Sequence, residues 1–259
     1  RRPHLFSAGY QFYFDREPHP ELGLGYIVPY WLDSVPSDLL LEVGATHILL
    51  PLDSEKRTHV VEQIARIAPE TILFLTKLES LTIEQPQATA LKLEVDKRSR
   101  PLVIVKNGDR SVPYWIHQRS VLRPADLVEE KRPGVSSRDV SIAFRLQNDP
   151  MSVYSVFAYL PTEMKSGFPF LVNADFILST SREVIPIDRP WNQWLRDQIA
   201  PCFVEAFVKL IRDRKYCQQA YRYIPLKDDV GSPFFAKTVE AIHTDLRNRA
   251  VVRTDPGNA

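Results

Sequence analysis

The sequence predicts an α+β protein in which a mainly antiparallel sheet is followed by C-terminal helices. Six segments with strand patterns follow one another between residues 91 and 178. From Pro190 onward the apolar residues recur at three- and four-residue steps instead, which is typical of helices. The length of 259 residues allows two packed units, and a composition of 44% hydrophobic and 25% charged residues excludes general disorder.

Residues 1–87 are predicted to form a small N-terminal unit. Three of its segments have strand patterns: 7–14, 26–31 and 46–52. We expect a helix after the third, with Asp53 or Ser54 as its N-cap and Pro69 as its stop signal. A buried turn or short helix leading into a strand should span residues 71–83. The polar stretch 85–89 then predicts a boundary between about 85 and 90.

Residues 88–259 are predicted to form the larger unit. Its strand candidates are 91–96, 102–106, 112–121, 140–146, 153–160 and 170–178. Asn107 and Gly108 predict a tight hairpin, because both residue types accept a positive φ. A helix beginning at Pro190 should be kinked or split at Pro201, and a second amphipathic helix is expected within 234–249.

Composition also bears on function. Lys plus Arg number 33 and Asp plus Glu 32, so the charge excess expected of a nucleic-acid binder is missing. No apolar run approaches the length of about 18–20 residues that a membrane helix needs. Cys202 and Cys217 lack a CxxC neighbour, and the six His residues form no metal-ligand pattern. We therefore expect no nucleic-acid, membrane or metal partner, and an intracellular (cytoplasmic or nuclear) protein with reduced thiols.

Arg182 is the candidate catalytic residue. Thr180 and Glu183 form a capping box after an apolar strand, and Pro186 keeps the resulting turn short, so Arg182 is predicted on a tight bend at the strand end. A guanidinium held there is suited to a bidentate contact with a carboxylate or with a transferring γ-phosphoryl group. The alternative is a structural ion pair with a nearby acid such as Asp188.

The stretch VNADFILSTSREVIPIDRPWNQWLRDQIAPCFVEAF resembles the NO VEIN and sacsin group of large proteins with a GHKL (Bergerat-type) ATPase, and more distantly the ninety-kilodalton heat-shock chaperone. The segments FSAGYQFYF, GLGYIVPYW and GATHILLPLD are similar to the region just after the ATP lid in that group. The matches extend from about residue 6 to 250 in a fairly specific order. The resemblance implies a C-terminal remnant of a GHKL domain over 1–87 and a chaperone-type middle domain over 88–259.

The resemblance also implies roles for two residues. Thr46 matches the threonine of a Gly-Thr pair that contacts nucleotide, although Ala45 stands where the glycine usually is. Arg182 matches the Ser-Arg-Glu arginine that reaches the γ-phosphate across the domain boundary. ATP and Mg²⁺ are then expected in the intact protein, held by an upstream nucleotide-binding half. The chain alone, which lacks the family's helix, Asp-x-Gly loop and lid, is expected to bind neither and to be inactive.

The resulting functional hypothesis is the middle region of an ATP-dependent chaperone-like or scaffolding protein, which couples nucleotide state to conformational change and acts on an unknown protein client. The rival is a nucleotide-independent protein-interaction module with aromatic anchors at Trp191, Trp194, Phe203 and Phe207. These four are also typical core residues. A self-contained enzyme remains a third interpretation, which requires a pocket with convergent titratable groups.

Overall fold

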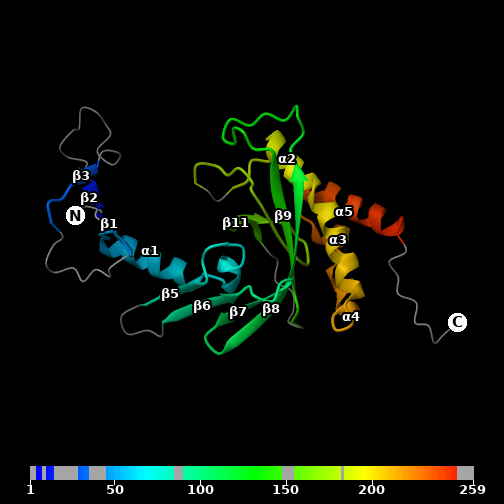
Figure 1. Ribbon diagram of the computed structural model, residues 1–259, viewed down its shortest axis with the longest axis horizontal. Helices are drawn as coiled ribbons and strands as arrows, with labels where there is room; N and C mark the ends of the chain where they lie inside the picture. The colour runs from blue at the N-terminus through cyan, green and yellow to red at the C-terminus, as the bar shows by residue number, and fades with distance from the viewer. Residues whose placement is uncertain are drawn as a thin grey trace. The chain divides into compact units, whose positions relative to one another are not determined.

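The computed structural model describes residues 4–7, 10–14, 29–34, 45–84, 90–147, 155–181 and 184–249. The chain divides into two compact units, Arg1–Ile67 and Ala68–Ala259. Each unit has its own β-sheet (Figure 1). The second unit combines a mainly antiparallel sheet with C-terminal helices, which confirms the predicted α+β class. No helix among the described residues has both the length and the apolar character needed to cross a bilayer.

The first unit holds a four-stranded antiparallel sheet in the order β3-β2-β1-β4. Its elements are β1 His4–Ser7, β2 Tyr10–Phe14, β3 Pro29–Trp31, β4 Thr46–Leu49 and α1 Ser54–Ala65. The prediction of one strand over 7–14 was wrong, because Ser7 pairs with Tyr10 across an antiparallel ladder. Pattern alone did not predict this reversal. Directly opposed residues of an antiparallel pair point to the same face, so alternation in the sequence does not mark where one strand ends and the next begins.

Helix α1 begins as predicted. The Asp53 side chain accepts a hydrogen bond from the Lys56 backbone N–H at 2.8 Å, which satisfies one of the donors left free at a helix start. The same bond, together with the Lys56 ammonium, lowers the pKa of Asp53. The helix ends at Ala65, ahead of Pro69.

The second unit is built on an eight-stranded sheet in the order β11-β10-β12-β9-β8-β7-β6-β5. The strands are β5 Ser80–Ile83, β6 Leu91–Asp96, β7 Leu102–Asn107, β8 Arg110–Leu122, β9 Ser137–Arg145, β10 Ser155–Ala158, β11 Leu160–Lys165 and β12 Leu171–Ala174. Every pair of neighbours is antiparallel except β10 and β12, which run parallel. Strand β12 is therefore inserted between β9 and β10.

Most of the strand predictions are confirmed, including the bounds of β6. The hairpin at Gly108 is also present, with a φ of 55° at that glycine. The single strand predicted over 153–160 was wrong, because the chain reverses at Tyr159 and continues as β11. Tyr159 adopts a φ of 67°, a left-handed conformation that its residue type does not signal.

The helices of the second unit follow the sheet. They are α2 Pro190–Asp197, α3 Ile199–Arg212, α4 Cys217–Ala220 and α5 Pro233–Arg247, with short 3-10 turns η2 Pro69–Ile72, η3 Tyr221–Tyr223 and η4 Lys227–Asp229. The predicted split occurs at Gln198, three residues before Pro201. Proline conflicts with the carbonyl four residues earlier, so Pro201 is placed in the first turn of a new helix instead of the interior of a long one.

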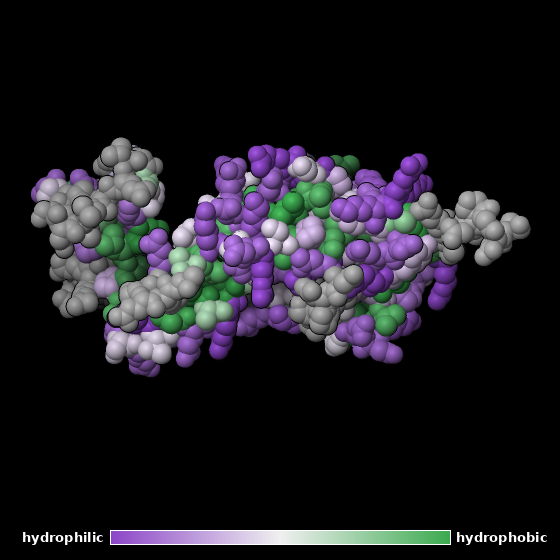
Figure 2. Space-filling model, turned by 90° about the horizontal axis from the view of Figure 1, so that it is seen from below, coloured by the Kyte–Doolittle hydropathy of each residue, from purple (hydrophilic) through white to green (hydrophobic). Residues whose placement is uncertain are grey.

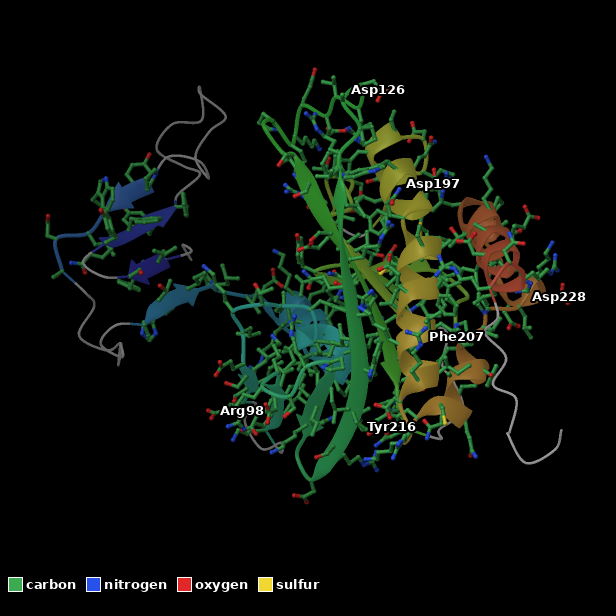
Figure 3. All side chains as sticks on the ribbon, turned by 45° about the vertical axis from the view of Figure 1, so that its right-hand side comes forward. Arg98, Asp126, Asp197, Phe207, Tyr216 and Asp228 are labelled. Atoms are coloured by element: carbon green, nitrogen blue, oxygen red, sulfur yellow. The ribbon has the colours of Figure 1, made fainter. Side chains whose placement is uncertain are left out.

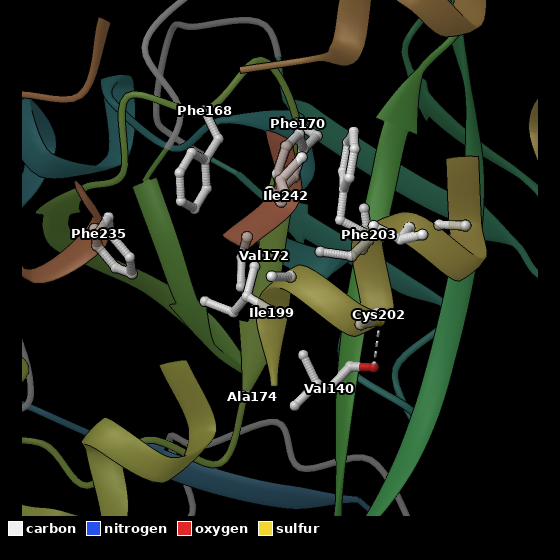
Figure 4. Packing of buried hydrophobic residues seen from close by; sticks show 14 of the residues in the cluster. Val140, Phe168, Phe170, Val172, Ala174, Ile199, Cys202, Phe203, Phe235 and Ile242 are labelled. Carbon is white, nitrogen blue, oxygen red and sulfur yellow. Dashed lines mark hydrogen bonds between the residues drawn. The ribbon is translucent and has the colours of Figure 1, made fainter. Parts of the chain in front are cut away.

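The main core lies between the sheet and the helices. Phe203 of α3 stacks on Phe170 at 4.8 Å between ring centroids (Figure 4). It also meets Phe144 of β9 edge-on at 5.9 Å. Cys202 donates to the Val140 carbonyl at 3.4 Å in the same layer. On the opposite face of the sheet, the η2 segment contacts β6 and β7 and contributes the buried residues Ile72, Leu73 and Phe74.

The division between the compact units falls at Ile67, about twenty residues before the expected boundary, which lies in the undescribed stretch 85–89. Strand β5 pairs with β6, so residues 80–83 are part of the second sheet. The assignment of 1–87 and 88–259 to two family domains stays a prediction.

Candidate functional site

The segment that carries the Ser181-Arg182-Glu183 motif connects β12 to α2. Arg182 and Glu183 lie outside the described residues, and so does the predicted capping bond of Glu183. Both flanks are described: the Ser179 N–H donates to the Val184 carbonyl at 2.9 Å. Ser181, the first residue of the motif, and Val184, which follows it, are exposed.

Two residues of α2 hold this segment against the second unit. Asn192 is fully buried; its side-chain oxygen accepts from the Ile177 N–H at 2.8 Å, and its amide nitrogen donates to the carbonyls of Ile177 at 2.9 Å and Pro186 at 2.8 Å. Trp191 donates its indole N–H to the Asp175 carbonyl at 2.9 Å. The connection is thus fixed to the helix both before and after the motif.

A buried carboxylate lies where β12 ends. Asp175 accepts from both Arg132 Nε and Nη2 at 2.7 Å, and from Arg138 Nε at 2.6 Å. The hydrogen bond to Asp175 raises the pKa of Arg132. These residues come from distant parts of the sequence, and spacing gave no signal for the cluster. Its effect is to fix the start of the connection to β9 and to the loop before it.

Thr46, the candidate nucleotide-contact residue, is exposed in β4 of the first unit. Its hydroxyl lies 2.7 Å from the Ser7 hydroxyl of β1. Gly44, the other residue of the matched pair, lies outside the described residues. Thr46 belongs to the first unit and the flanks of Arg182 to the second.

The second unit also contains a pocket of about 450 Å³. Its floor is a row of polar residues across three adjacent strands: Gln118 of β8 pairs with Ser141 of β9, which pairs with Asn173 of β12. Because side chains alternate along a strand, Ser141 points away from the face on which Val140 and Ile142 join the helix-covered core. The pocket therefore lies on the sheet face opposite α3.

The walls of the pocket combine apolar and charged groups. Phe74 and Ile116 provide apolar surface. Lys97 donates to the Leu75 carbonyl and, at 3.2 Å, to the Leu78 carbonyl; burial, together with repulsion from Arg100, lowers its pKa. Arg100 is exposed and makes no hydrogen bond or ion pair with any residue that the structure describes.

Two further residues complete the wall. The Asp139 carboxylate accepts from Gln118 Nε2 at 2.7 Å and from the Ser120 hydroxyl. The Tyr159 N–H donates to Asn173 Oδ1 at 2.8 Å, and burial raises the pKa of its phenol. This pocket was not predicted from the sequence. Its signal there is the alternation of Asp139 and Ser141 with Val140 and Ile142, which predicts a polar face opposite an apolar one.

The predicted aromatic anchors lie in the core. Trp191, Phe203 and Phe207 are fully buried, and Trp194 is partly buried against the same cluster. Their interpretation as core residues is confirmed for Trp191, Phe203 and Phe207, which are too deeply buried to serve as exposed anchors. Hydrophilic side chains cover much of the visible face of the second unit, with only separate apolar areas between them (Figure 2).

Two further titratable residues of the sequence, Cys202 and His117, are buried in the second unit. Cys202 is buried, and burial raises the pKa of its thiol to about 12. His117 lies with Nε2 3.2 Å from Glu205 and Nδ1 3.4 Å from Lys209, and burial lowers its pKa. Among the described residues no three His, Cys, Asp or Glu side chains come together in a way that could hold a metal ion.

These features define a two-unit α+β protein in which α2 is bonded to Ile177 and Pro186 of the connection after β12, with a polar pocket on the face of the larger sheet opposite α3. Comparison with known proteins shows that the chain is similar to Protein NO VEIN of Arabidopsis thaliana, with 30% identity over 277 aligned positions. The similarity covers 95% of this chain but only 10% of that protein, so the chain spans about a tenth of the length of this relative. No family model matches the chain. No solved structure matches it either.

Proposed function

We propose that this chain is the post-lid and middle region of a larger GHKL-type (Bergerat-fold) ATPase of the NO VEIN and sacsin group. In that protein it couples nucleotide state to conformational change, as part of a chaperone-like or scaffolding machine. The ordered motifs of the sequence support the proposal, and so does the similarity to Protein NO VEIN over 95% of the chain. The small share of that relative covered by the chain is consistent with one region of a much larger protein.

The observation that carries the proposal is the double attachment of the connection between β12 and α2. Asn192 bonds to Ile177 before the Ser-Arg-Glu motif and to Pro186 after it. A cation carried on a fixed segment needs less reorganisation when charge develops on a transferring phosphoryl group, and preorganised groups of this kind supply much of the catalytic effect in phosphoryl transfer. Arg182 is the cation that we assign to this role.

In this proposal ATP and Mg²⁺ are held mainly by the upstream half of the intact protein. Among the described residues no three His, Cys, Asp or Glu side chains come together as a metal-ligand group. Thr46 offers one exposed hydroxyl to a nucleotide, already within hydrogen-bond distance of Ser7. A single neutral hydroxyl adds only about 0.5–1.5 kcal/mol, so the chain alone should have no useful affinity for ATP.

The test is steady-state ATPase kinetics of the intact protein with Arg182→Ala. We expect kcat to fall by about 10³-fold or more, which is the contribution measured for arginines that act on the transition state. ATP affinity should change by less than about threefold, because the interaction forms mainly in the transition state. Arg98→Ala is the matched control, since Arg98 is exposed on a turn of the same unit (Figure 3).

Asn192→Ala separates positioning from chemistry. It removes the attachment of the connection while leaving Arg182 in the sequence, so we expect kcat to fall by less than in Arg182→Ala. Normal turnover in the Arg182→Ala protein would overturn the proposal and favour the nucleotide-independent interaction module. A loss of ATP affinity equal to the loss of kcat would also contradict it, because the arginine would then be a ground-state binding group.

A further inference from the structure

The pocket on the open sheet face contains buried polar groups whose hydrogen-bonding capacity is not used. Ser141 and Asn173 are each only 6% exposed, and both line the pocket. Within the described part of the chain, neither the Ser141 hydroxyl nor the Asn173 amide nitrogen has a hydrogen-bond partner. Both groups reach the surface of the pocket, where they are available to bond a polar occupant.

The orientation of the Asn173 amide is fixed by the backbone of Tyr159. Asn173 Oδ1 accepts from the Tyr159 N–H at 2.8 Å, where the chain adopts the left-handed φ of 67°. Non-glycine residues in this region of φ cost about 1–3 kcal/mol and cluster at functional sites. Because the oxygen is engaged, the NH₂ group is the end of the side chain that remains to donate into the pocket. The donor is thus preorganised.

The charges at the rim favour an anion. Lys97 and Arg100 follow β6 and both line this pocket, whereas Arg138, which also lines it, is already paired with Asp175. Arg100 has its full set of donors available within the described residues, and Lys97 uses two of its three N–H groups on carbonyls. Two neighbouring cations match a dianion better than a single carboxylate, and a guanidinium binds phosphate through two parallel hydrogen bonds.

The other walls indicate what is attached to that anion. The Asp139 carboxylate is an acceptor, and it pairs only with the neutral groups of Gln118 and Ser120 among the residues described. A carboxylate of this kind binds hydroxyl groups of a ligand, while Phe74 and Ile116 provide apolar contact for a carbon skeleton. The volume of about 450 Å³ suits a small metabolite.

We propose that this pocket binds a small phosphate monoester that carries hydroxyl groups, such as a sugar phosphate. The phosphate lies against Arg100 and Lys97, and the hydroxyl groups lie over the Ser141–Asn173 floor toward Asp139. The pocket includes neither Thr46 nor Arg182 and lies entirely within the second unit. The inference therefore stands whether or not the intact protein hydrolyses ATP.

Isothermal titration calorimetry of this chain with ribose 5-phosphate, inorganic phosphate and ribose tests the proposal. Ribose 5-phosphate should bind with a Kd of about 1 mM or tighter, as expected for a ligand of its size. Inorganic phosphate should bind at least about tenfold more weakly, because it makes only the ionic contacts. Ribose alone should give no measurable heat. Amide NMR shifts at Ser141, Asn173 and Tyr159 should follow the titration.

Arg100→Gln should weaken binding of ribose 5-phosphate by about tenfold or more, the effect of losing a charge-assisted hydrogen bond. The matched control Arg98→Gln removes an equal charge two residues away, outside this pocket, and should leave the Kd unchanged. Ser141→Ala, which tests the floor, should weaken binding about threefold to tenfold.

Arg100 is exposed, so that variant folds even if a floor variant does not. Absence of saturable binding overturns the proposal. Equal loss in Arg98→Gln and Arg100→Gln, or equal affinities for inorganic phosphate and ribose 5-phosphate, overturns it as well.

Discussion

The two faces of the eight-stranded sheet are formed by the same strands, but one face is covered by helices and the other carries a polar pocket. On β9, Val140, Ile142 and Phe144 are fully buried beneath the helices, while Asp139 and Ser141 point to the opposite face and line a polar pocket. Stability and binding are therefore divided between alternate residues of one segment. A substitution at one position should change the folding free energy, and a substitution at the next should change ligand affinity.

The largest expected difference is in cysteine chemistry and lies within the helix layer that covers one face. Cys202 lies on the side of α3 that packs against the sheet, and burial raises its pKa to about 12, so almost no thiolate forms at pH 8. Cys217 on α4 is only partly buried. Each single variant leaves one thiol: Cys202 in Cys217→Ser and Cys217 in Cys202→Ala. We expect Cys202 to react with a disulfide reagent at least about a thousandfold more slowly than Cys217. Comparable rates in the folded state would show that the helix layer opens readily; both thiols should react at similar rates in denaturant.

Removing a large side chain from the core beneath the helices should have the next largest effect, as a loss of stability. Phe203→Ala removes a fully buried ring that contacts Phe144 and Phe170, and should lower the free energy of unfolding by about 3–5 kcal/mol. Ser141→Ala on the open face should change it by less than about 1 kcal/mol. Urea denaturation monitored by circular dichroism measures both. Equal losses would mean that the pocket face is as essential to the fold as the core.

Asp175→Asn tests the buried carboxylate at the end of β12, which pairs with two arginines. The change removes a charge, 9% exposed, that is bound by the side chains of Arg132 and Arg138. Since both guanidinium groups retain contact with water, we expect a loss of about 2–3 kcal/mol, toward the lower end of values for broken buried pairs. Glu94→Gln, in an exposed pair with Lys92, is the control and should be close to neutral. A neutral Asp175→Asn would show that the cluster does not stabilise the fold.

The smallest expected effect concerns pH. Burial lowers the pKa of His117 in the folded protein, although its hydrogen bond to Glu205 opposes this shift and Lys209 and Arg119 reinforce it. The unfolded chain therefore takes up a proton first, so this contribution to stability is present above the ordinary pKa of 6.5 and is lost as pH falls below it. His117→Gln should flatten the decrease in unfolding free energy between pH 7.5 and 5.5. An unchanged pH profile would exclude His117 as its source.

Local pattern was sufficient for the parts of the fold that depend on neighbours in sequence. The Asn107–Gly108 hairpin, the Asp53 cap and the buried face of α5 all follow from residues within a few positions of one another. The reversal at Tyr159 was missed because a tyrosine carries no preference for positive φ and is held there by Asn173, fourteen residues away.

The pocket was missed for a related reason. Its floor depends on the register of β8, β9 and β12, and register across a sheet is set by packing on the opposite face, not by the local residues. Arg182 and Thr46 were found through resemblance and local motifs, and their roles stay predictions. The attachment by Asn192 adds a physical reason why the connection that bears Arg182 should be held in place.

The position of β12 between β9 and β10 has a consequence for how the chain is made. Synthesis proceeds from the N-terminus, so β9 leaves the ribosome with one edge unpaired, and that edge stays bare through the emergence of β10 and β11. The apolar side chains that α3 covers in the finished protein are unprotected for longer still. An unpaired edge next to uncovered apolar surface invites pairing with other chains. We therefore expect the nascent chain to pass through an aggregation-prone stage that ends only when α3 has emerged.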